Sequence, residues 1–311
     1  MRKACLRKIC LGALLGLALS GPVAAQDRDF SKVEIKATLV AGKIHMLEGA
    51  GGNIGVSVGS DGLLIVDDQF APLADKIRAA LKGLGKGDLA FVLNTHWHFD
   101  HTGGNESFGP EATIIAHDNV RKRMEKGQTI FGDVIPPAAP KALPVITFGE
   151  SVSLHFNGEE IRMLHYPHGH TDGDSVIFFT GSNVVHMGDD YFAGRFPFID
   201  IESGGSLAGL TENVEKILGQ LPADVKIIPG HGPLSTKADL QGYLAMLKET
   251  TAHVRQRIEA GKDLKAIQAE GLPEKWKEWG SGFITTEDRI ALIHGSLTNK
   301  ASGSGSGTHH H

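Results

Sequence analysis

Short apolar runs separated by glycine turns fill the chain between residues 33 and 93. Runs of about five residues, some alternating between apolar and polar positions, are typical of β-strands. They predict strands at residues 33–37, 43–47, 54–58, 63–67 and 89–93. In residues 71–86 the apolar positions recur at helical spacing and predict an amphipathic helix. Gly51 and Gly52 predict a flexible tip between the second and third of these strands.

The rest of the chain repeats this order of elements. Residues 127–144 are rich in Gly and Pro, lack periodicity and predict a long loop. Thr236 and Asp239 have the spacing of a capping box and predict the start of a long helix. Strands are predicted at 112–116, 145–148, 151–156, 160–166, 175–180 and 183–187 and before Pro229, and helices at 118–126, from Ser206, from Thr236 to about 260, at 263–270 and at 286–297. Two halves of similar order predict an α/β fold, a four-layer αββα sandwich with two sheets face to face between helices.

The two ends of the chain have the composition of processing and expression segments. Four basic residues precede an apolar stretch from Ile9 to Leu19 and small residues at 23–25, which is the pattern of a secretory signal peptide over residues 1–25. Residues 301–311 are a Gly/Ser stretch ending in histidines and predict a linker and the remnant of a tag. We therefore expect one domain at 26–300 and a periplasmic or secreted protein.

Composition narrows the partners of the predicted mature domain. Both cysteines, Cys5 and Cys10, fall in the predicted signal peptide, so the domain has neither a disulfide nor a thiolate ligand. Removing the four basic residues of that peptide from 31 leaves 27 against 36 acidic residues. This mild acidity argues against binding to nucleic acid or, after cleavage, to a membrane. A small-molecule substrate is the expected partner, and the oligomeric state stays open.

The densest group of chemically active side chains follows the predicted strand at 89–93. His96, His98, Asp100 and His101 lie within six residues, just before a glycine-containing turn. Such a density of imidazoles beside a carboxylate is difficult to accommodate without a metal. In a turning segment His96 and His98 can converge on one ion, while Asp100 and His101 point toward a second. The pattern predicts a metal site on a loop at the end of a strand.

Three later segments place further ligand types at the ends of predicted strands. His170 lies in a turn-rich segment, Asp189 follows a strand directly, and His231 lies between two glycines. His168 and Asp190 are the neighbouring alternatives to His170 and Asp189. In a sandwich whose loops gather along one edge, these side chains would meet the first group.

These motifs resemble those of the metallo-β-lactamase superfamily. The shared motifs are His-x-His-x-Asp-His at 96–101, Gly-His-Thr at 169–171, Gly-Asp at 188–189, Gly-His-Gly at 230–232 and the strand-end Asp67. The resemblance implies the four-layer sandwich and a site for two metal ions. It favours His170 over His168 and Asp189 over Asp190.

The resemblance also implies how the ligands are shared. One ion would be bound by His96, His98 and His170, the other by Asp100, His101 and His231, with Asp189 as a bridge. Asp67 would orient the ligands without touching a metal. Nitrogen and oxygen ligands suit two zinc ions best, with manganese or iron as alternatives.

The activity that this resemblance implies is hydrolysis. A hydroxide shared by two ions would attack a carbonyl group, and Asp100 would steer it through a hydrogen bond. A complete ligand set with Asp189 looks more like glyoxalase II and lactonases than like the β-lactamases that have cysteine there. Export favours a β-lactam or another cyclic amide or ester, with a lactone, thioester or phosphoester as the alternative. Outside the hydrolases, an iron-dependent redox enzyme and a metal-binding protein without turnover remain open.

Substrate contacts are expected from residues 50–53, 127–144 and 191–205. Arg195 lies six residues after Asp189 and could bind a carboxylate through two parallel hydrogen bonds. Tyr191 lies near Asp189, as a tyrosine does in the lactonases, although the spacing differs by one residue. Arg195 and Tyr191 are therefore the predicted substrate-binding side chains.

Overall fold

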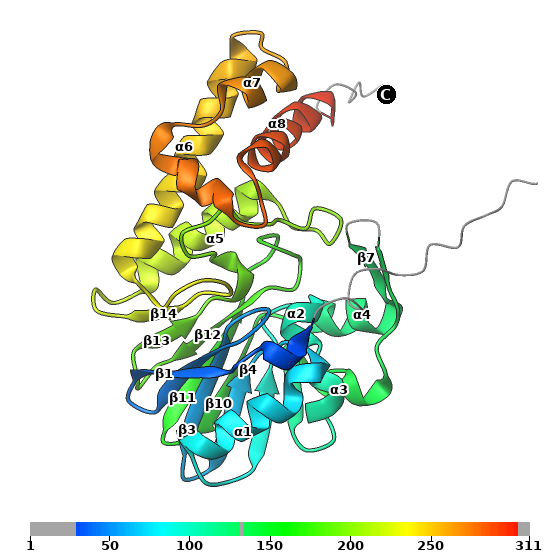
Figure 1. The fold of residues 1–311 in the computed structure, drawn as a ribbon, viewed down its shortest axis with the longest axis vertical. Helices are drawn as coiled ribbons and strands as arrows, with labels where there is room; N and C mark the ends of the chain where they lie inside the picture. The colour runs from blue at the N-terminus through cyan, green and yellow to red at the C-terminus, as the bar shows by residue number, and fades with distance from the viewer. Residues whose placement is uncertain (1–28, 131–132, 304–311) are drawn as a thin grey trace, which may run out of the picture.

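In the computed structural model, which describes residues 29–130 and 133–303, the apolar runs of the first half form a seven-stranded sheet (Figure 1). Its strands from β1 to β4 are antiparallel neighbours, and those from β4 to β9 run parallel. In spatial order they are β1 (Lys36–Ala41), β2 (Ile44–Glu48), β3 (Ile54–Gly59), β4 (Gly62–Val66), β5 (Leu89–Leu93), β6 (Thr113–His117) and β9 (Ile146–Phe148).

The second half forms a six-stranded sheet. All neighbours in it are antiparallel except β13 and β14, which run parallel. Its strands, in order, are β10 (Ser151–Phe156), β11 (Glu159–His165), β12 (Ser175–Phe179), β13 (Val184–His186), β14 (Lys226–Ile228) and β15 (Ser235–Thr236).

The two sheets pack face to face through their apolar positions. Leu64 and Val66 of β4 meet Ile161 and Ile177 of the second sheet in one buried cluster. Because side chains alternate along a strand, Ile65 points to the opposite face, where it packs with the first helical layer. All five residues of β4 are buried, as expected for a strand covered on both faces.

Helices cover both outer faces, which confirms the predicted αββα sandwich. The first sheet is covered by α1, and the second by α5 and α6, which pack in one cluster with α8 (Figure 1). The helices are α1 (Ala74–Leu84), α2 (Phe99–Thr102), α3 (Asn105–Phe108), α4 (Asp118–Lys126), α5 (Leu207–Gln220), α6 (Lys237–Glu259), α7 (Leu264–Glu270) and α8 (Thr286–Gly303). The 3-10 segments are η1 (Phe30–Lys32), η2 (Ala71–Leu73), η3 (Pro140–Ala142), η4 (Gly188–Asp190) and η5 (Glu274–Ser281).

Three segments differ from the sequence-based prediction. Residues 127–144 are not a plain loop, because β7 (Gln128–Ile130) and β8 (Asp133–Ile135) pair as a hairpin. Three-residue strands are too short to show periodicity in the sequence. The first strand begins at Lys36 rather than at Val33, because Lys76 Nζ donates to the backbone oxygens of 30, 31 and 33. The 3-10 segment η5 was not predicted.

The predicted end segments lie largely outside the described residues. The expected signal peptide at 1–25 lies outside the described residues, as do residues 304–311 of the expected tag. Helix α8 continues to Gly303, past the predicted end at 297 and into the expected linker. Among the described residues, no helix combines the length and apolar character needed to cross a membrane.

Candidate metal centre

Strand ends from both sheets bring the predicted ligands together at one edge of the sandwich. His96 and His98 follow β5, His170 follows β11, Asp189 lies in η4 after β13, and His231 follows β14. The ligand atoms of each of two groups lie within 4.8 Å of one another, and the groups are His96, His98, His170 and Asp189, and Asp100, His101 and His231. The structure thus brings all seven predicted ligands together in the two predicted groups.

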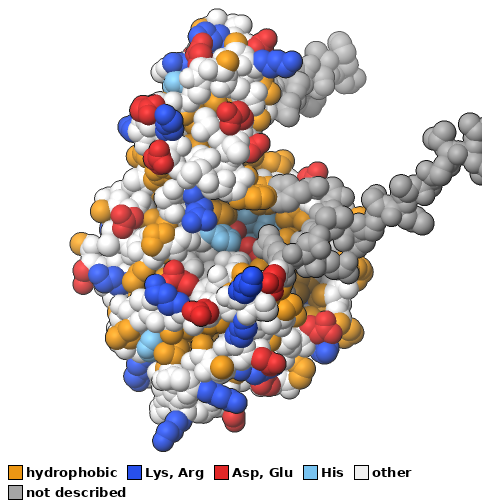
Figure 2. Space-filling view, viewed as in Figure 1, with side chains coloured by type: hydrophobic (Ala, Val, Ile, Leu, Met, Phe, Trp, Pro, Cys, Tyr) orange, Lys and Arg blue, Asp and Glu red, His pale blue; other side chains and the backbone are white. Residues whose placement is uncertain are grey.

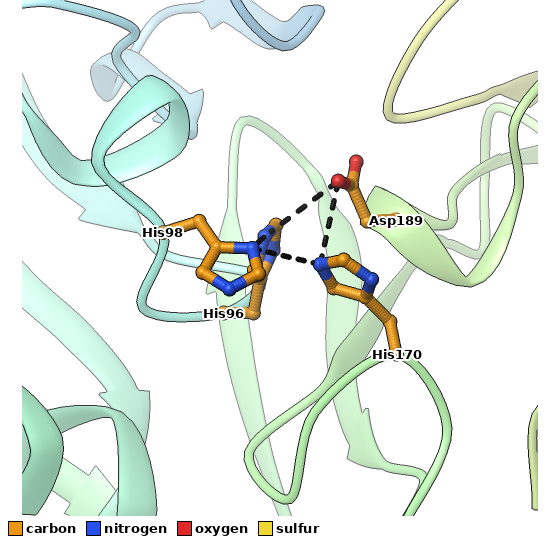
Figure 3. A group of neighbouring side chains, drawn as sticks. All are labelled: His96, His98, His170 and Asp189. Atoms are coloured by element: carbon orange, nitrogen blue, oxygen red, sulfur yellow. Dashed lines mark hydrogen bonds and ion pairs between the residues drawn. The ribbon is translucent and has the colours of Figure 1, made fainter. Parts of the chain in front are cut away.

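In the first group three imidazoles face one another (Figure 3). His98 Nδ1 lies 2.8 Å from His170 Nε2 and 3.1 Å from His96 Nε2. In the second group, His231 Nε2 lies 3.3 Å from His101 Nε2 and 3.4 Å from Asp100 Oδ2. Each group therefore presents several ligand atoms to one small volume.

Asp189 lies between the two groups. Its Oδ2 atom is 3.5 Å from His170 Nε2 and 3.8 Å from His96 Nε2. Its Oδ1 atom is 3.1 Å from His101 Nε2 and 3.4 Å from His231 Nε2. One carboxylate oxygen thus faces each group, as a bridging ligand requires.

Hydrogen bonds on the outer side of the rings show which nitrogens are bare. His98 Nε2 lies 3.0 Å from Asp200 Oδ2, and His170 Nδ1 lies 2.9 Å from the Phe198 carbonyl oxygen. Both partners only accept hydrogen bonds, so in the neutral rings these outer nitrogens carry the proton. The inner nitrogens, 2.8 Å apart, then face each other with lone pairs. Two acceptors at this distance repel unless a cation lies between them.

Asp67 fixes the rings of His96 and His101 in the same way. The Thr95 hydroxyl donates to Asp67 Oδ2 at 2.7 Å and can therefore accept from His96 Nδ1 at 3.0 Å. His101 Nδ1 lies 2.7 Å from the same Oδ2 atom. The inner Nε2 atoms of His96 and His101 are then ligand atoms, and Asp67 orients them from outside the cluster. The donor set therefore fits metal ions.

The ionisation of these side chains follows from burial and from their neighbours. Burial, with the neighbouring charge of His101, lowers the pKa of His96 well below its ordinary value. Burial also lowers the pKa of His170, to about 4. Neutral imidazoles are the form that binds a metal ion.

In the second group, neighbouring opposite charges stabilise the ionised forms of the side chains. Burial alone would lower the pKa of His231, but Asp189 and Asp100 outweigh it and raise that pKa to about 9. Burial alone would raise the pKa of Asp100, yet His101 and His231 lower it to about 2. Binding of a metal ion to this group at neutral pH would therefore displace a proton from His231.

Asp200 is a functional residue that the sequence reasoning missed. Besides orienting His98, it accepts from Ser203 N at 2.9 Å, and its carboxylate is buried. Burial would raise its pKa, but the hydrogen bonds from His98 and Ser203 lower it to about 2. Its only sequence signal is a carboxylate in the predicted substrate segment 191–205.

The glycine tip is anchored rather than flexible, which corrects the expectation for residues 51 and 52. Gly52 N donates to the Asp100 carbonyl oxygen at 3.0 Å, and Asn53 N donates to the Gly230 carbonyl oxygen at 2.7 Å. A Cβ atom on Gly52 would lie 2.2 Å from His101 Cε1. The tip needs glycine there because the backbone passes directly over a ligand ring.

The alternative ligands lie elsewhere. His168 is exposed, with a left-handed backbone at φ +55°, and its Nδ1 bonds the Gly204 carbonyl oxygen. Asp190 is buried on the far side of His170, where it accepts from His170 N at 3.4 Å. Neither belongs to the two ligand groups described above.

A cavity of about 370 Å³ opens above the ligands. Figure 2 shows histidine side chains at the bottom of a hollow on this face, with hydrophobic side chains around it. Arg195 lies on the cavity wall, as predicted. The full lining is Gly51, His98, Phe99, Asp100, Ile130, Asp189, Phe192, Arg195, Phe196, Phe198, His231, Phe283 and Ile284. Each of the three predicted substrate segments contributes to it.

Tyr191 does not line this cavity, which corrects its predicted role. Its side chain is 1% exposed, and its hydroxyl donates to Ser235 Oγ at 3.1 Å. The ring packs against Tyr243 of α6, with centroids 5.0 Å apart. The chain turns through η4 just before Tyr191, so this side chain points into the helical layer while Phe192 faces the site.

The sequence matches the family model described as the metallo-beta-lactamase superfamily over residues 49–231. It is similar to the 2,4-dinitroanisole O-demethylase subunit alpha of Nocardioides sp., with 24% identity over 66% of this chain and 60% of that one. It is also similar to a hydroxyacylglutathione hydrolase of Rhodospirillum rubrum, with 30% identity over 51% of this chain and 54% of that one. The chain thus spans less than two thirds of the length of these curated relatives.

Solved structures share the fold. The DIM-1 metallo-beta-lactamase aligns over 70% of this chain and 99% of its own, with a TM-score of 0.58 and 17% identity. The sec-alkylsulfatase Pisa1 from Pseudomonas sp. aligns over 88% of this chain and 52% of its own, with a TM-score of 0.61 and 15% identity. At such identities the likeness concerns the fold alone.

Proposed function

The chain belongs to the metallo-beta-lactamase superfamily. We propose that it is a metal-dependent hydrolase that works in the periplasm or outside the cell with two divalent ions, zinc first. The observation that carries the dinuclear site is Asp189, whose two oxygens face the two ligand groups at 3.1–3.8 Å. The bare nitrogens of the buried histidines support the same proposal.

Two divalent ions held here would supply a water acidic enough to give hydroxide near neutral pH and a Lewis acid for a carbonyl oxygen. The protein contributes orientation. Asp100 lines the cavity and is ionised at neutral pH, so it can accept a hydrogen bond from the attacking water. His231 lies beside it, 3.4 Å away.

The proposed substrate is a small molecule with a cyclic amide or ester, with β-lactams first because of the expected export. The similarity to a hydroxyacylglutathione hydrolase favours a thioester as the alternative, and lactones and phosphoesters follow. Neither nucleic acid nor a membrane surface is a proposed partner, since the predicted mature chain is mildly acidic.

Metal content and turnover test this function together. Protein purified without chelator should contain about two ions per chain, as seven ligand side chains imply. Zinc- or manganese-loaded protein should hydrolyse at least one of nitrocefin, a lactone, a thioester or a phosphodiester. A content that stays near one with zinc in excess contradicts the bridged site, and a silent panel contradicts the substrate assignment.

The location has its own test. If residues 1–25 are a signal peptide, N-terminal sequencing of the protein recovered from the periplasm or medium should begin at Gln26. Retention of the full chain inside the cell would contradict the proposed export.

A further inference from the structure

One wall of the cavity comes from a segment beyond the family match, which ends at residue 231. Phe283 and Ile284 lie between η5 and α8, and both line the cavity above the ligands. The family motifs therefore build the floor of the site, while a C-terminal segment of this chain builds part of its entrance.

This segment is attached directly to the loop that follows Asp189. Phe196 N donates to the Trp279 carbonyl oxygen at 3.1 Å. The rings of Phe198 and Phe283 lie edge to face, with centroids 6.5 Å apart. A Cβ atom on Gly282 would come within 3.5 Å of Arg195 Cβ. The apolar wall and the cation at the entrance thus form one contiguous surface.

Aromatic contacts with α6 also hold this C-terminal segment in place. Trp279 stacks on Tyr243 of α6 with centroids 6.3 Å apart, and it packs edge to face on Trp276 at 5.3 Å. The indole of Trp276 donates to Glu249 at 3.1 Å. The position of Phe283 therefore depends on contacts with α6, independently of the metal ligands.

Apolar side chains make up about half of the cavity lining. Five phenylalanines and two isoleucines line it, and among the described residues Arg195 is the only basic side chain there apart from the ligand histidines. Phe283 is 71% exposed, so a large aromatic surface stays in water at the entrance. Covering such a surface with an apolar group is favourable, and a cation beside it selects a negative charge.

We propose that Phe283 is a specificity-determining residue. Together with Arg195, it makes the site select anionic substrates that carry a bulky apolar group, aryl or branched alkyl. In such a substrate the reacting bond lies over the ligands, the anionic group pairs with Arg195, and the apolar group packs against the exposed surface of Phe283 beside Phe198. This inference rests on the proposed hydrolase function, and it adds the substrate class.

Binding of two carboxylates tests it without any need for turnover. Dissociation constants of acetate and 2-naphthylacetate are measured by calorimetry, on zinc-loaded and on chelator-treated protein. The wild-type protein should bind 2-naphthylacetate at least tenfold more tightly than acetate. Phe283→Ala should raise the dissociation constant of 2-naphthylacetate roughly five- to tenfold and leave that of acetate unchanged, because only the apolar contact is lost.

Two further variants separate specificity from a structural effect. Phe283→Leu keeps an apolar side chain and should restore most of the preference. Leu39→Ala removes another exposed apolar side chain, 61% exposed on β1 and outside the cavity lining, and should change neither constant. Equal binding of 2-naphthylacetate by Phe283→Ala and the wild type overturns the inference, as does a wild type without preference.

These outcomes are distinct from failure of the proposed function. If the wild type binds fewer than two ions or hydrolyses nothing, the hydrolase proposal is refuted. The role of Phe283 still stands if Phe283→Ala loses the preference for 2-naphthylacetate over acetate. If the wild type and Phe283→Ala both hydrolyse esters and show the same preference for aryl groups, only the inference about Phe283 is refuted.

Discussion

At the scale of single residues, four of the five ligand imidazoles are aimed by an acceptor on their outer side, and these are His96, His98, His101 and His170. Asp200 aims His98, and Asp67 aims His101 and, through Thr95, His96. Asp67 follows β4 of the first sheet, whereas Asp200 lies in the loop between η4 and α5. Loss of Asp200 should therefore disturb mainly the first group, and loss of Asp67 should disturb both groups.

We therefore expect Asp200→Ala to weaken the first metal site roughly 10–100-fold, the usual effect of losing a ligand's outer partner. Asp67→Ala should also weaken the second site, because His101 loses its acceptor. Cobalt titration followed by visible absorption measures both affinities. Asp75→Ala, which removes an exposed carboxylate outside the site, is the control. Unchanged cobalt affinity in Asp200→Ala would show that His98 is held by other contacts.

Arg195 should act on binding rather than on the reaction step. A carboxylate remote from the reacting bond is held equally in the ground and transition states, and such binding appears in KM alone. Arg195→Gln should raise KM for anionic substrates roughly tenfold or more, for a charge-assisted pair of about 1.5–3 kcal/mol. Steady-state kinetics with an acid and its neutral methyl ester measure this. If the variant loses activity on the acid and on the methyl ester alike, Arg195 has a structural role.

Arg289 is a buried cation without a counter-charge among its described contacts. It is fully buried, its Nη2 atom donates to Thr250 at 3.1 Å, and its Nε and Nη1 atoms have no hydrogen-bond partner among the described residues. Burial lowers its pKa to about 10. We expect Arg289→Met to raise the free energy of unfolding by roughly 1–3 kcal/mol, because an apolar side chain of similar length removes the desolvation cost. Urea unfolding measures it, and a loss of stability would point to trapped water as the missing partner.

At the scale of elements, glycines in the turns after the strands allow the backbone to pass close to a ligand side chain. A Cβ atom on Gly230, two residues after the end of β14, would lie 2.0 Å from Asp189 Oδ1. Gly230→Ala should therefore displace the bridging carboxylate, lower the affinity for metal at least tenfold and cost roughly 1–3 kcal/mol of stability. Cobalt titration and urea unfolding measure the two effects.

Gly242 gives the matched control. It lies inside α6, and a Cβ atom added there would meet no atom of the described residues within 4 Å, so Gly242→Ala should raise stability by roughly 0.5–1 kcal/mol. If Gly230→Ala keeps the metal affinity of the wild type, Asp189 can move without loss and its bridging position is not required.

The strands themselves were largely predictable. Short apolar runs and glycine turns identify β2 to β6, because each of these strands buries apolar side chains on the sheet. The capping box at Thr236 is present and opens α6 as predicted. The hairpin of β7 and β8 was not predictable, because two strands of three residues are defined by their pairing and not by a pattern.

At the scale of the whole molecule, protons and metal ions compete for one cluster, which gives stability a pH dependence. In chelator-treated protein the pKa of His231 is raised from 6.5 to about 9, and that of His101 is raised as well. A raised pKa stabilises the fold fully below pH 6.5, and this contribution is lost as pH rises through about 9. The lowered pKa values of His96 and His170 act only below pH 6.5.

Stability of chelator-treated protein should therefore fall between pH 6.5 and 9.5, by on the order of 3 kcal/mol for His231 alone. Urea unfolding at several pH values measures this, and His231→Gln should remove the share of the fall that comes from His231, leaving that of His101. Zinc-loaded protein should lack it, since bound metal replaces the protons. An equal fall with and without zinc would show that the ligand cluster is not its source.

The sequence by itself determined the layers and the ligand types. Local patterns are sufficient for these, because strand periodicity, turn residues and the density of histidine after β5 are properties of neighbouring residues. They identified His96, His98, Asp100 and His101 directly, and the ends of later strands indicated the partners.

Only the tertiary structure decided which side chains stand behind and above that cluster. Asp200 reaches His98 across 102 positions of sequence, and Phe283 meets the cavity from a segment beyond the second sheet. Tyr191 and Phe192 are adjacent in sequence, yet one enters the helical layer and the other lines the site. Such placements depend on how loops from distant strands pack together, and no local pattern in the sequence encodes that packing.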